Sequence, residues 1–589
     1  MLKINSVRRG LMLGTEIVGA WLSWYGRAFA GSCSPATGAS ITCTGPAANG
    51  TDVTQNLTIT AGGTVSTSSG FGIDTTGKGG NAFNVTGPGA FLDNNGSIIT
   101  SGLTGVNAAN ATAAGSLAIT TSGTVTGTAN YGIHAVNGAT SNNLTISAAN
   151  ATGGENGIYA FNHGTGALTI TTSGLIQNTL RGTNSSQHLF GIYGRNAGTN
   201  LSVTAAALTG GQDGIRAVND GTGALSINTT GVVTGVYGDG ILARNNTNGT
   251  NLTVVASGPV NAYRVGVYAK NYGTGALSIT TTDAVNGLAA VSIGVYARNN
   301  ARGTGLTISS AGAVGGLDGI QARNFGTGAL SVTASGPVTG SSRYGVFATN
   351  AGTSLSVTTG AATGGINGIH AVNNGTGGTT ITSSGDVTGT SGAGVYATAG
   401  NTTSGTLTIS QAAGTTITGG THGIVATNEG TGSTSITASG VVTGTTGDGI
   451  SVSNVATATT LDLTTSATVT GGINGIDAVN LGSGALHITA NGNVTGSGND
   501  GILATNGSTD SVIGTAAGTQ VTGSVNGIAV VNSGAGATSI TSNGAVTGIA
   551  NDGILANNGT TATTLSITTW HPYWAARTES KRCISAPVR

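Results

Sequence analysis

A six-residue phrase, Gly-Ile-x-Ala-x-Asn, returns along most of this 589-residue chain at a spacing of about 26 residues. Its glycine stands at 17 positions from Gly132 to Gly553, which gives a mean step of about 26 residues. The last six of these glycines, from Gly423 to Gly553, are evenly spaced. Repeats of this length without a helical pattern indicate a solenoid, in which each repeat buries its apolar side against its neighbours.

Each repeat divides into three short strand candidates that are separated by Gly, Asn or Thr turns. In the repeat that begins at Gly214 these candidates are residues 215–219, 224–227 and 232–234. Side chains alternate along a strand, so Arg216 and Val218 point outward. The inward residues of this repeat are Ile215, Ala217, Leu225, Ile227 and Val233. Three strands per turn, with corners that glycine permits, predict an all-β fold: a right-handed parallel β-helix.

The last position of the phrase is Asn in 16 of the 17 copies, and Ala399 is the exception. Stacked Asn side chains can hydrogen-bond along a column, so we expect a structural Asn ladder. Near the end of the chain the repeats also match in pairs, every 52 residues, at Gly423, Gly475 and Gly527. Duplication of a two-coil block explains this longer period, and an alternating functional face is the other interpretation.

Composition agrees with an ordered repeat rather than a linker. Charged residues make up 6% of the chain and aromatic residues 4%, whereas Gly accounts for 106 of 589 residues. A flexible Gly-rich linker would lack the periodic Ile, Val and Leu positions seen here. The regular apolar positions therefore predict a buried core.

The N-terminal segment, residues 1–30, has the features of a secretory signal peptide. Lys3, Arg8 and Arg9 precede an apolar stretch over residues 11–22. The sequence Ala28-Phe29-Ala30 before Gly31 is a small-x-small cleavage site, so we expect cleavage between Ala30 and Gly31. An uncleaved membrane anchor is the alternative, but the apolar run is short for a span of about 20 residues.

Export would place the cysteines that follow the signal peptide in an oxidising compartment. Cys33 and Cys43 lie in a predicted N-terminal cap, residues 31–55, and the repeats contain no Cys. In an oxidising compartment these two cysteines can form a disulfide; free thiols are the alternative. We expect the repeat domain over residues 56–569 and an atypical tail over residues 570–589, whose altered composition suggests a shifted reading frame or truncation; a cap on the solenoid is the alternative.

Sequence motifs for catalysis are weak, and we expect no enzyme activity, no cofactor and no metal site. Asp448, Asp500 and Asp552 recur in one column, but they are two coils apart, or roughly 10 Å. Asn474 and Asn526 lie between them, and turn chemistry explains all five residues better than a catalytic cluster. A β-helical polysaccharide-active enzyme would need carboxylates that converge on neighbouring coils.

The outward positions of the phrase carry aromatic and basic residues over the middle of the chain. From residue 181 to 343 there are ten Lys or Arg and five acidic residues, whereas residues 344–569 hold eight acidic residues and no Lys or Arg. Such a stripe could bind acidic glycans through stacking and ion pairing; solubility of exposed strands is the alternative explanation. The candidate ligand-binding residues, here called the outward stripe, are Tyr193, Arg195, Arg216, Arg244, Tyr268, Lys270, Tyr296, Arg298 and Arg323.

The exported start and Gly/Thr/Asn-rich repeats such as Gly221-Thr222-Gly223-Ala224-Leu225-Ser226-Ile227 resemble the passenger region of bacterial autotransporter (type V secretion) proteins. The resemblance covers about residues 56–569, and filamentous-haemagglutinin-like exoproteins share its composition. It implies adhesion, aggregation or host contact at the cell surface. The family also carries a C-terminal outer-membrane barrel, and no series of alternating strands of about ten residues follows Thr569 in this sequence.

We therefore expect an exported, non-catalytic β-solenoid whose partners are acidic glycans or host and cell-surface molecules. Nucleic acid is not an expected partner, because no folded nucleic-acid module is visible. Association with the outer membrane would depend on a barrel that this chain lacks, and without its translocator the product would be periplasmic. An inactive, truncated remnant is the remaining alternative.

Overall fold

The computed structural model describes residues 32–34, 38–44, 48–49, 57–67, 72–75, 83–86, 89–93, 98–110, 114–180, 189–400, 404–570 and 582–584. The predicted signal peptide and its cleavage point lie outside these residues. The chain falls into two compact units, Met1–Tyr237 (unit 1) and Gly238–Arg589 (unit 2). Strands joined by turns account for the described residues, and none of these residues forms a helix that could span a membrane.

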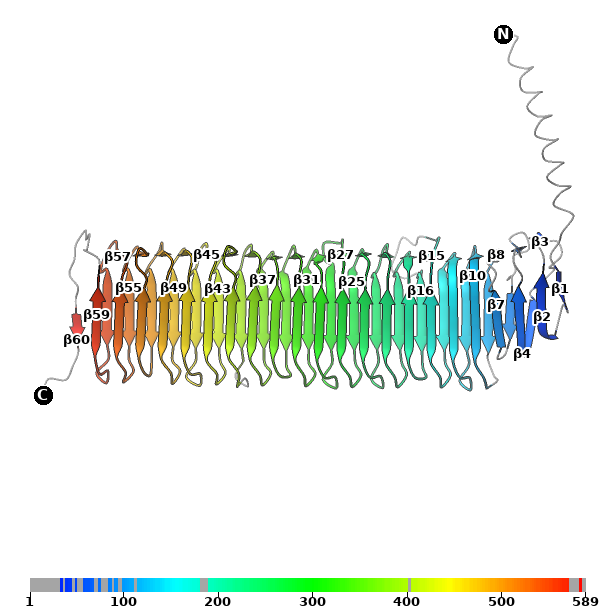
Figure 1. Ribbon diagram of the computed structural model, residues 1–589, viewed down its shortest axis with the longest axis horizontal. Coiled ribbons are helices and arrows are strands. Elements are labelled where there is room, and N and C mark those ends of the chain that lie inside the picture. Colours follow the sequence, from blue (N-terminus) through cyan, green and yellow to red (C-terminus); the bar gives the residue numbers. More distant parts are fainter. Residues whose placement is uncertain are drawn as a thin grey trace, which may run out of the picture. The chain divides into compact units, whose positions relative to one another are not determined.

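The same three-strand turn builds both units. In unit 1 the turn at Gly214 contains β19 (Ile215–Asn219), β20 (Leu225–Thr229) and β21 (Val233–Gly235), within one or two residues of the predicted bounds. In unit 2 strands pair in parallel with the strand three places later in the chain, so that successive turns form stacked rungs (Figure 1). The predicted all-β parallel solenoid with a repeat of roughly 26 residues is confirmed.

The phrase forms the first strand of each rung. In unit 1 these strands are β11 (Tyr131–Asn137), β13 (Asn156–Asn162), β16 (Ile192–Asn196) and β19, and β9 (Val106–Asn110), which precedes the first copy of the phrase, pairs with β11 in the same column. In unit 2 they are β22 (Ile241–Asn245), β25 (Val265–Asn271), β28 (Ile293–Asn299), β31 (Asp318–Asn324), β34 (Tyr344–Asn350), β37 (Asn367–Asn373), β40 (Val395–Ala399), β43 (Ile424–Asn428), β46 (Ile450–Asn454), β49 (Ile476–Asn480), β52 (Ile502–Asn506), β55 (Ile528–Asn532) and β58 (Ile554–Asn558).

The second and third strands complete each rung. In the rung that begins with β25 they are β26 (Leu277–Thr281) and β27 (Val285–Gly287), and in the rung of β52 they are β53 (Ser511–Thr515) and β54 (Gln520–Gly523). Each stacks in register on the equivalent strand of the next rung, as Leu277 does on Leu306 and Val285 on Ala313. Equivalent residues therefore form columns that run from rung to rung.

Inward apolar residues form the core, as the alternation predicts. Ile215, Ala217, Leu225, Ile227 and Val233 are all fully buried. Burying an Ile, Leu or Val side chain contributes about 1.5–3 kcal/mol before ordering entropy is subtracted. Because every rung repeats the pattern, the core consists of short stacks of like residues.

The glycine of the phrase is required by space rather than by backbone conformation. A Cβ added at Gly501 would lie 2.5 Å from the carbonyl oxygen of Gly527 and 2.8 Å from Cγ1 of Val521. Among the described residues a positive φ occurs at Gly115, Gly414 and Gly518, none of which belongs to the phrase. The phrase glycine is therefore required by packing, because successive rungs approach too closely there for a side chain.

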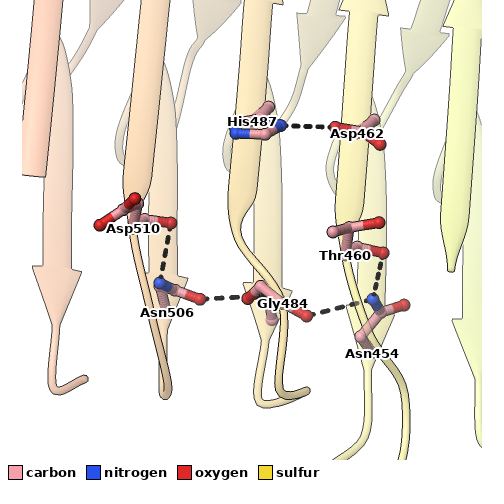
Figure 2. Close-up of polar contacts among 8 residues, drawn as sticks. Asn454, Thr460, Asp462, Gly484, His487, Asn506 and Asp510 are labelled. Atoms are coloured by element: carbon pink, nitrogen blue, oxygen red, sulfur yellow. Dashed lines mark hydrogen bonds and ion pairs between the residues drawn. The ribbon is translucent and has the colours of Figure 1, made fainter. Parts of the chain in front are cut away.

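The predicted Asn ladder is present and joins neighbouring rungs. Nδ2 of Asn454 donates to Oδ1 of Asn480 at 3.1 Å, and Nδ2 of Asn480 donates to Oδ1 of Asn506 at 3.2 Å. The same amides also bind the turn that follows, as Asn454 does with the carbonyl of Thr460 at 2.9 Å (Figure 2). Asn454 and Asn480 thus each hold their own corner and the next rung together, whereas within the described residues Nδ2 of Asn506 binds only the carbonyls of its own corner, those of Thr509 and Asp510.

At the N-terminal end, β1 (Ser32–Ser34) and β2 (Gly38–Thr44) pair antiparallel, and the register places Cys33 opposite Cys43. Their side chains lie outside the described part of the molecule, so the disulfide stays a prediction. Within the tail, β60 (Arg582–Ile584) pairs in parallel with β58.

Candidate anion-binding face

Four basic residues of the outward stripe occupy one column on consecutive rungs of unit 2. The strand register pairs Arg244 with Lys270, Lys270 with Arg298, and Arg298 with Arg323. Neighbouring rungs in a sheet are about 4.8 Å apart, so the backbone positions that carry these four basic side chains follow one another at that spacing. We call Arg244, Lys270, Arg298 and Arg323 the cation column.

Aromatic rings hold these cations in place. Lys270 Nζ lies 4.7 Å from the ring centre of Tyr268, and the Arg298 guanidinium lies 4.9 Å from that of Phe325. The guanidinium groups of Arg244 and Arg323 lie over Tyr272 and Phe347, at 5.3 and 5.0 Å. A ring face attracts a cation without neutralising it. The side chains are therefore ordered while their charge remains available.

The charges of the cation column have no carboxylate partner within the described residues. The ion pairs of unit 2 involve other groups, such as Arg343, which pairs with the buried Asp318. Nε of Arg244 donates to Oδ1 of Asn246 at 2.8 Å, and the Nε atoms of Arg298 and Arg323 have no acceptor in the described structure. Like charges one rung apart repel by about 1 kcal/mol even at the dielectric constant of water. An anion bound along the column would relieve that repulsion.

Protonation keeps Lys270 positive. Burial of its side chain is the largest single influence and lowers its pKa, but the hydrogen bond with Tyr268 and the charge interactions with Tyr268, Tyr296 and Tyr272 together raise the pKa above its usual value. His370, further along the same face, differs. It stacks on Tyr396 with ring centres 4.7 Å apart, and burial lowers the pKa of His370 to about 4. His370 is thus neutral at physiological pH and adds no charge to this face.

The basic residues of the stripe in unit 1 carry partners. Nε of Arg195 lies 2.6 Å from Oδ2 of Asp220, and Nη1 of Arg216 lies 3.7 Å from Oδ2 of the buried Asp213. The hydrogen bond with Asp220 raises the pKa of Arg195 above its usual value. Tyr193 stacks on Tyr159 with ring centres 4.9 Å apart. The structure therefore separates the predicted stripe into ion-paired cations in unit 1 and open cations in unit 2.

Ring faces on the outward side are largely occupied. Tyr268 and Tyr296 stack on each other with ring centres 4.9 Å apart and 10° between their planes, and Lys270 covers both. Stacking of a sugar on these rings would need a free face. Stacking and ion pairing are the two contacts expected for a glycan, and the geometry therefore favours ion pairing. The phenol groups lie beside the cations and can form hydrogen bonds.

The carboxylates singled out in the sequence form a hydrogen-bonded ladder. The backbone N–H and Nδ2 of Asn474 both donate to Oδ1 of Asp448, at 2.9 and 3.0 Å, and Asn526 binds Asp500 in the same way. The N–H of Asp552 donates to Oδ1 of Asn526 at 3.2 Å. Asp448, Asn474 and Asp500 are at most 7% exposed. This geometry supports the turn interpretation of the column.

Two further acidic residues are Asp462, which lies beside His487, and Asp477, which lies near Asp448 of this ladder. His487 Nδ1 lies 2.7 Å from Oδ1 of Asp462 on an exposed part of the second strands (Figure 2). Burial, followed by the charge of Asp448, raises the pKa of Asp477 to about 6. Among the described residues no group of three or more His, Cys, Asp or Glu is arranged to hold a metal ion.

Comparison of the chain with protein-family models, curated proteins and solved structures found no match. The sequence already indicated the cation column, because Arg or Lys recurs at one phrase position in four successive repeats. The carboxylate partners of Arg195 and Arg216 were missed, because Asp220 and Asp213 lie in turns outside the phrase.

Proposed function

We propose that this chain is an exported, non-catalytic β-solenoid that acts by contact with acidic surfaces, in the manner of an autotransporter passenger. The observation that carries the proposal is the cation column, in which four ordered basic side chains present charge without a carboxylate partner in the described structure. Such a row is costly in isolation and becomes favourable when an anionic polymer binds. Acidic glycans at a cell surface are the partners with this chemistry.

The absence of catalysis is part of the same proposal. Asp448 and Asp500 are buried and hydrogen-bonded to their Asn neighbours, which supports a structural role. A β-helical polysaccharide-active enzyme would place accessible carboxylates on adjacent rungs. Export rests on the N-terminal sequence features alone.

Binding to immobilised dextran sulfate, with neutral dextran as the reference, tests the proposal. Replacing Arg244, Lys270, Arg298 and Arg323 together by Gln should weaken binding by roughly 1 to 4 kcal/mol, the sum of four exposed ion pairs. The control replaces Arg195 and Arg216 by Gln, which removes cations that already have carboxylate partners. Equal binding by wild type and the fourfold variant, with unchanged melting curves, would refute the role of the column.

A further inference from the structure

We infer that the cation column recognises a linear acidic polysaccharide that lies along the stacked rungs of unit 2 and presents one anionic group per rung. This inference rests on the proposed function and specifies its ligand. The register that aligns Arg244, Lys270, Arg298 and Arg323 also fixes the direction of the row, from rung to rung across the strands. A ligand that meets all four cations must therefore extend in that direction.

The length of the row favours a polymer over a small anion. One sulfate or carboxylate can reach two neighbouring cations that are about 4.8 Å apart, but not four. Beyond Arg323 the next two residues of the column are Thr349 and Val372. In that direction the positive row has a definite end, so the site accommodates a limited number of anionic groups.

The spacing of the cations favours one charge per sugar. A hexopyranose unit is about as long as the step of about 4.8 Å between two rungs, so a chain of uronic acids carries about one carboxylate for each rung that it crosses. Inorganic polyphosphate carries its charges closer together, and an extended single-stranded nucleic acid carries them further apart. The rung spacing thus matches an acidic polysaccharide best.

The neighbouring aromatic residues argue in the same direction. Proteins that bind single-stranded nucleic acid offer free ring faces on which bases stack. Here Tyr268 and Tyr296 stack on each other through one face each, and one face of Phe325 lies under the guanidinium of Arg298, although Phe325 remains 42% exposed. The remaining groups of the face are phenol hydroxyls and guanidinium N–H donors, which suit sugar hydroxyls and carboxylates.

The experiment measures binding of the full chain to oligogalacturonates, from disaccharide to octasaccharide, by calorimetry at physiological salt. Affinity should rise by roughly two- to fivefold for each added sugar up to about the tetrasaccharide, since each adds one exposed ion pair, and then level off. Methyl-esterified oligosaccharides of the same lengths should not bind, because they lack the charge. Arg298→Gln should lower tetrasaccharide affinity by the same two- to fivefold factor.

Arg195→Gln is the matched control. Arg195 has the same phrase position as Arg298 and lies over Phe161 at 5.1 Å, but it is paired with Asp220. Its replacement should leave the affinity unchanged. Melting curves of both variants show whether each is folded.

The possible outcomes separate the two proposals. If affinity increases with length without levelling off, and oligosaccharides with other charge spacings bind equally well, the one-charge-per-rung inference is wrong and the acidic-surface function stands. If folded protein binds neither oligogalacturonate nor dextran sulfate, both are wrong. Tight binding of single-stranded DNA in preference to the glycans would overturn the choice of ligand.

Discussion

The role of a side chain in this protein depends on which residue lies beside it in the next rung or in the next turn. Arg195 and Arg298 share one phrase position and one kind of aromatic partner, yet only Arg195 is paired with a carboxylate in the described structure. Glycines differ in the same way. A Cβ at Gly501 would meet the next rung, whereas a Cβ at Gly514 would have no atom within 4 Å. Identical residue types are therefore not equivalent along the solenoid.

Gly501→Ala should destabilise unit 2 by about 1–3 kcal/mol, because the added methyl group must displace backbone that is packed against it. Gly514→Ala should be neutral or slightly stabilising, since the site is open and alanine restricts the unfolded chain. Urea unfolding of both variants measures the difference. Equal stabilities for the two variants would contradict the steric explanation of the phrase glycine.

Asp477 should make stability depend on pH. Its pKa is raised to about 6, first by burial and then by the charge of Asp448, from an ordinary value of 3.8. The folded state then holds the proton more tightly than the unfolded state, so this residue's contribution to stability is greatest below pH 3.8 and is lost as pH rises through about 6.

Asp477→Asn removes this titration. Between pH 4 and pH 7 the melting temperature of the variant should fall less than that of the wild type. At pH 7 the variant should be the more stable of the two. Parallel melting-temperature profiles for the two proteins would show that Asp477 does not titrate as inferred.

At the scale of strands, two ladders of polar side chains link successive rungs. The Asn ladder closes the corner after the first strand, and the alternating Asp and Asn residues lie just before that strand. Alternation has a physical reason. Asn supplies the donor that Asp lacks, and successive carboxylates remain two rungs, or about 10 Å, apart. The 52-residue period, which duplication of a two-coil block explains, thus also matches the hydrogen-bonding requirement of the alternating Asp and Asn residues.

Asn474→Asp tests this requirement. The substitution removes the Nδ2 donor to Asp448 and places carboxylates on three consecutive rungs with Asp448 and Asp500. Repulsion of about 1 to 4 kcal/mol per neighbouring pair should destabilise the protein at pH 7 and should decrease in acid. Asn491→Asp, at an exposed corner, is the control for an added charge. A variant as stable as the control at pH 7 would count against the ladder.

At the scale of the whole molecule, stability should be a sum over rungs and their interfaces, because each rung contacts mainly its neighbours. The repeat also determines which deletions are compatible with the fold. Removing residues 475–526 takes out two whole rungs, 52 residues, and joins Asn474 to Gly527, so strand order and the Asp–Asn alternation are kept.

The 52-residue deletion should fold and unfold cooperatively, with a smaller denaturant m-value because less surface is exposed on unfolding. A 39-residue deletion of residues 475–513 joins Asn474 to Gly514, which lies inside β53, and should disrupt the stack. Circular dichroism and urea titration compare the two. Comparable folding of both would show that rung phase is not required.

The sequence by itself determined the repeat length, the inward residues such as Ile215 and Leu225, and the Asn ladder, because strand alternation and stacking depend only on local periodicity. The same periodicity predicted that basic residues would align. It could not reveal which of them remain without a carboxylate partner, since Asp220 and Asp213 come from turns of variable length. Nor could it show that the phrase glycine is a steric requirement. Those features depend on how closely neighbouring rungs approach and where their turns place side chains, which only the tertiary structure decides.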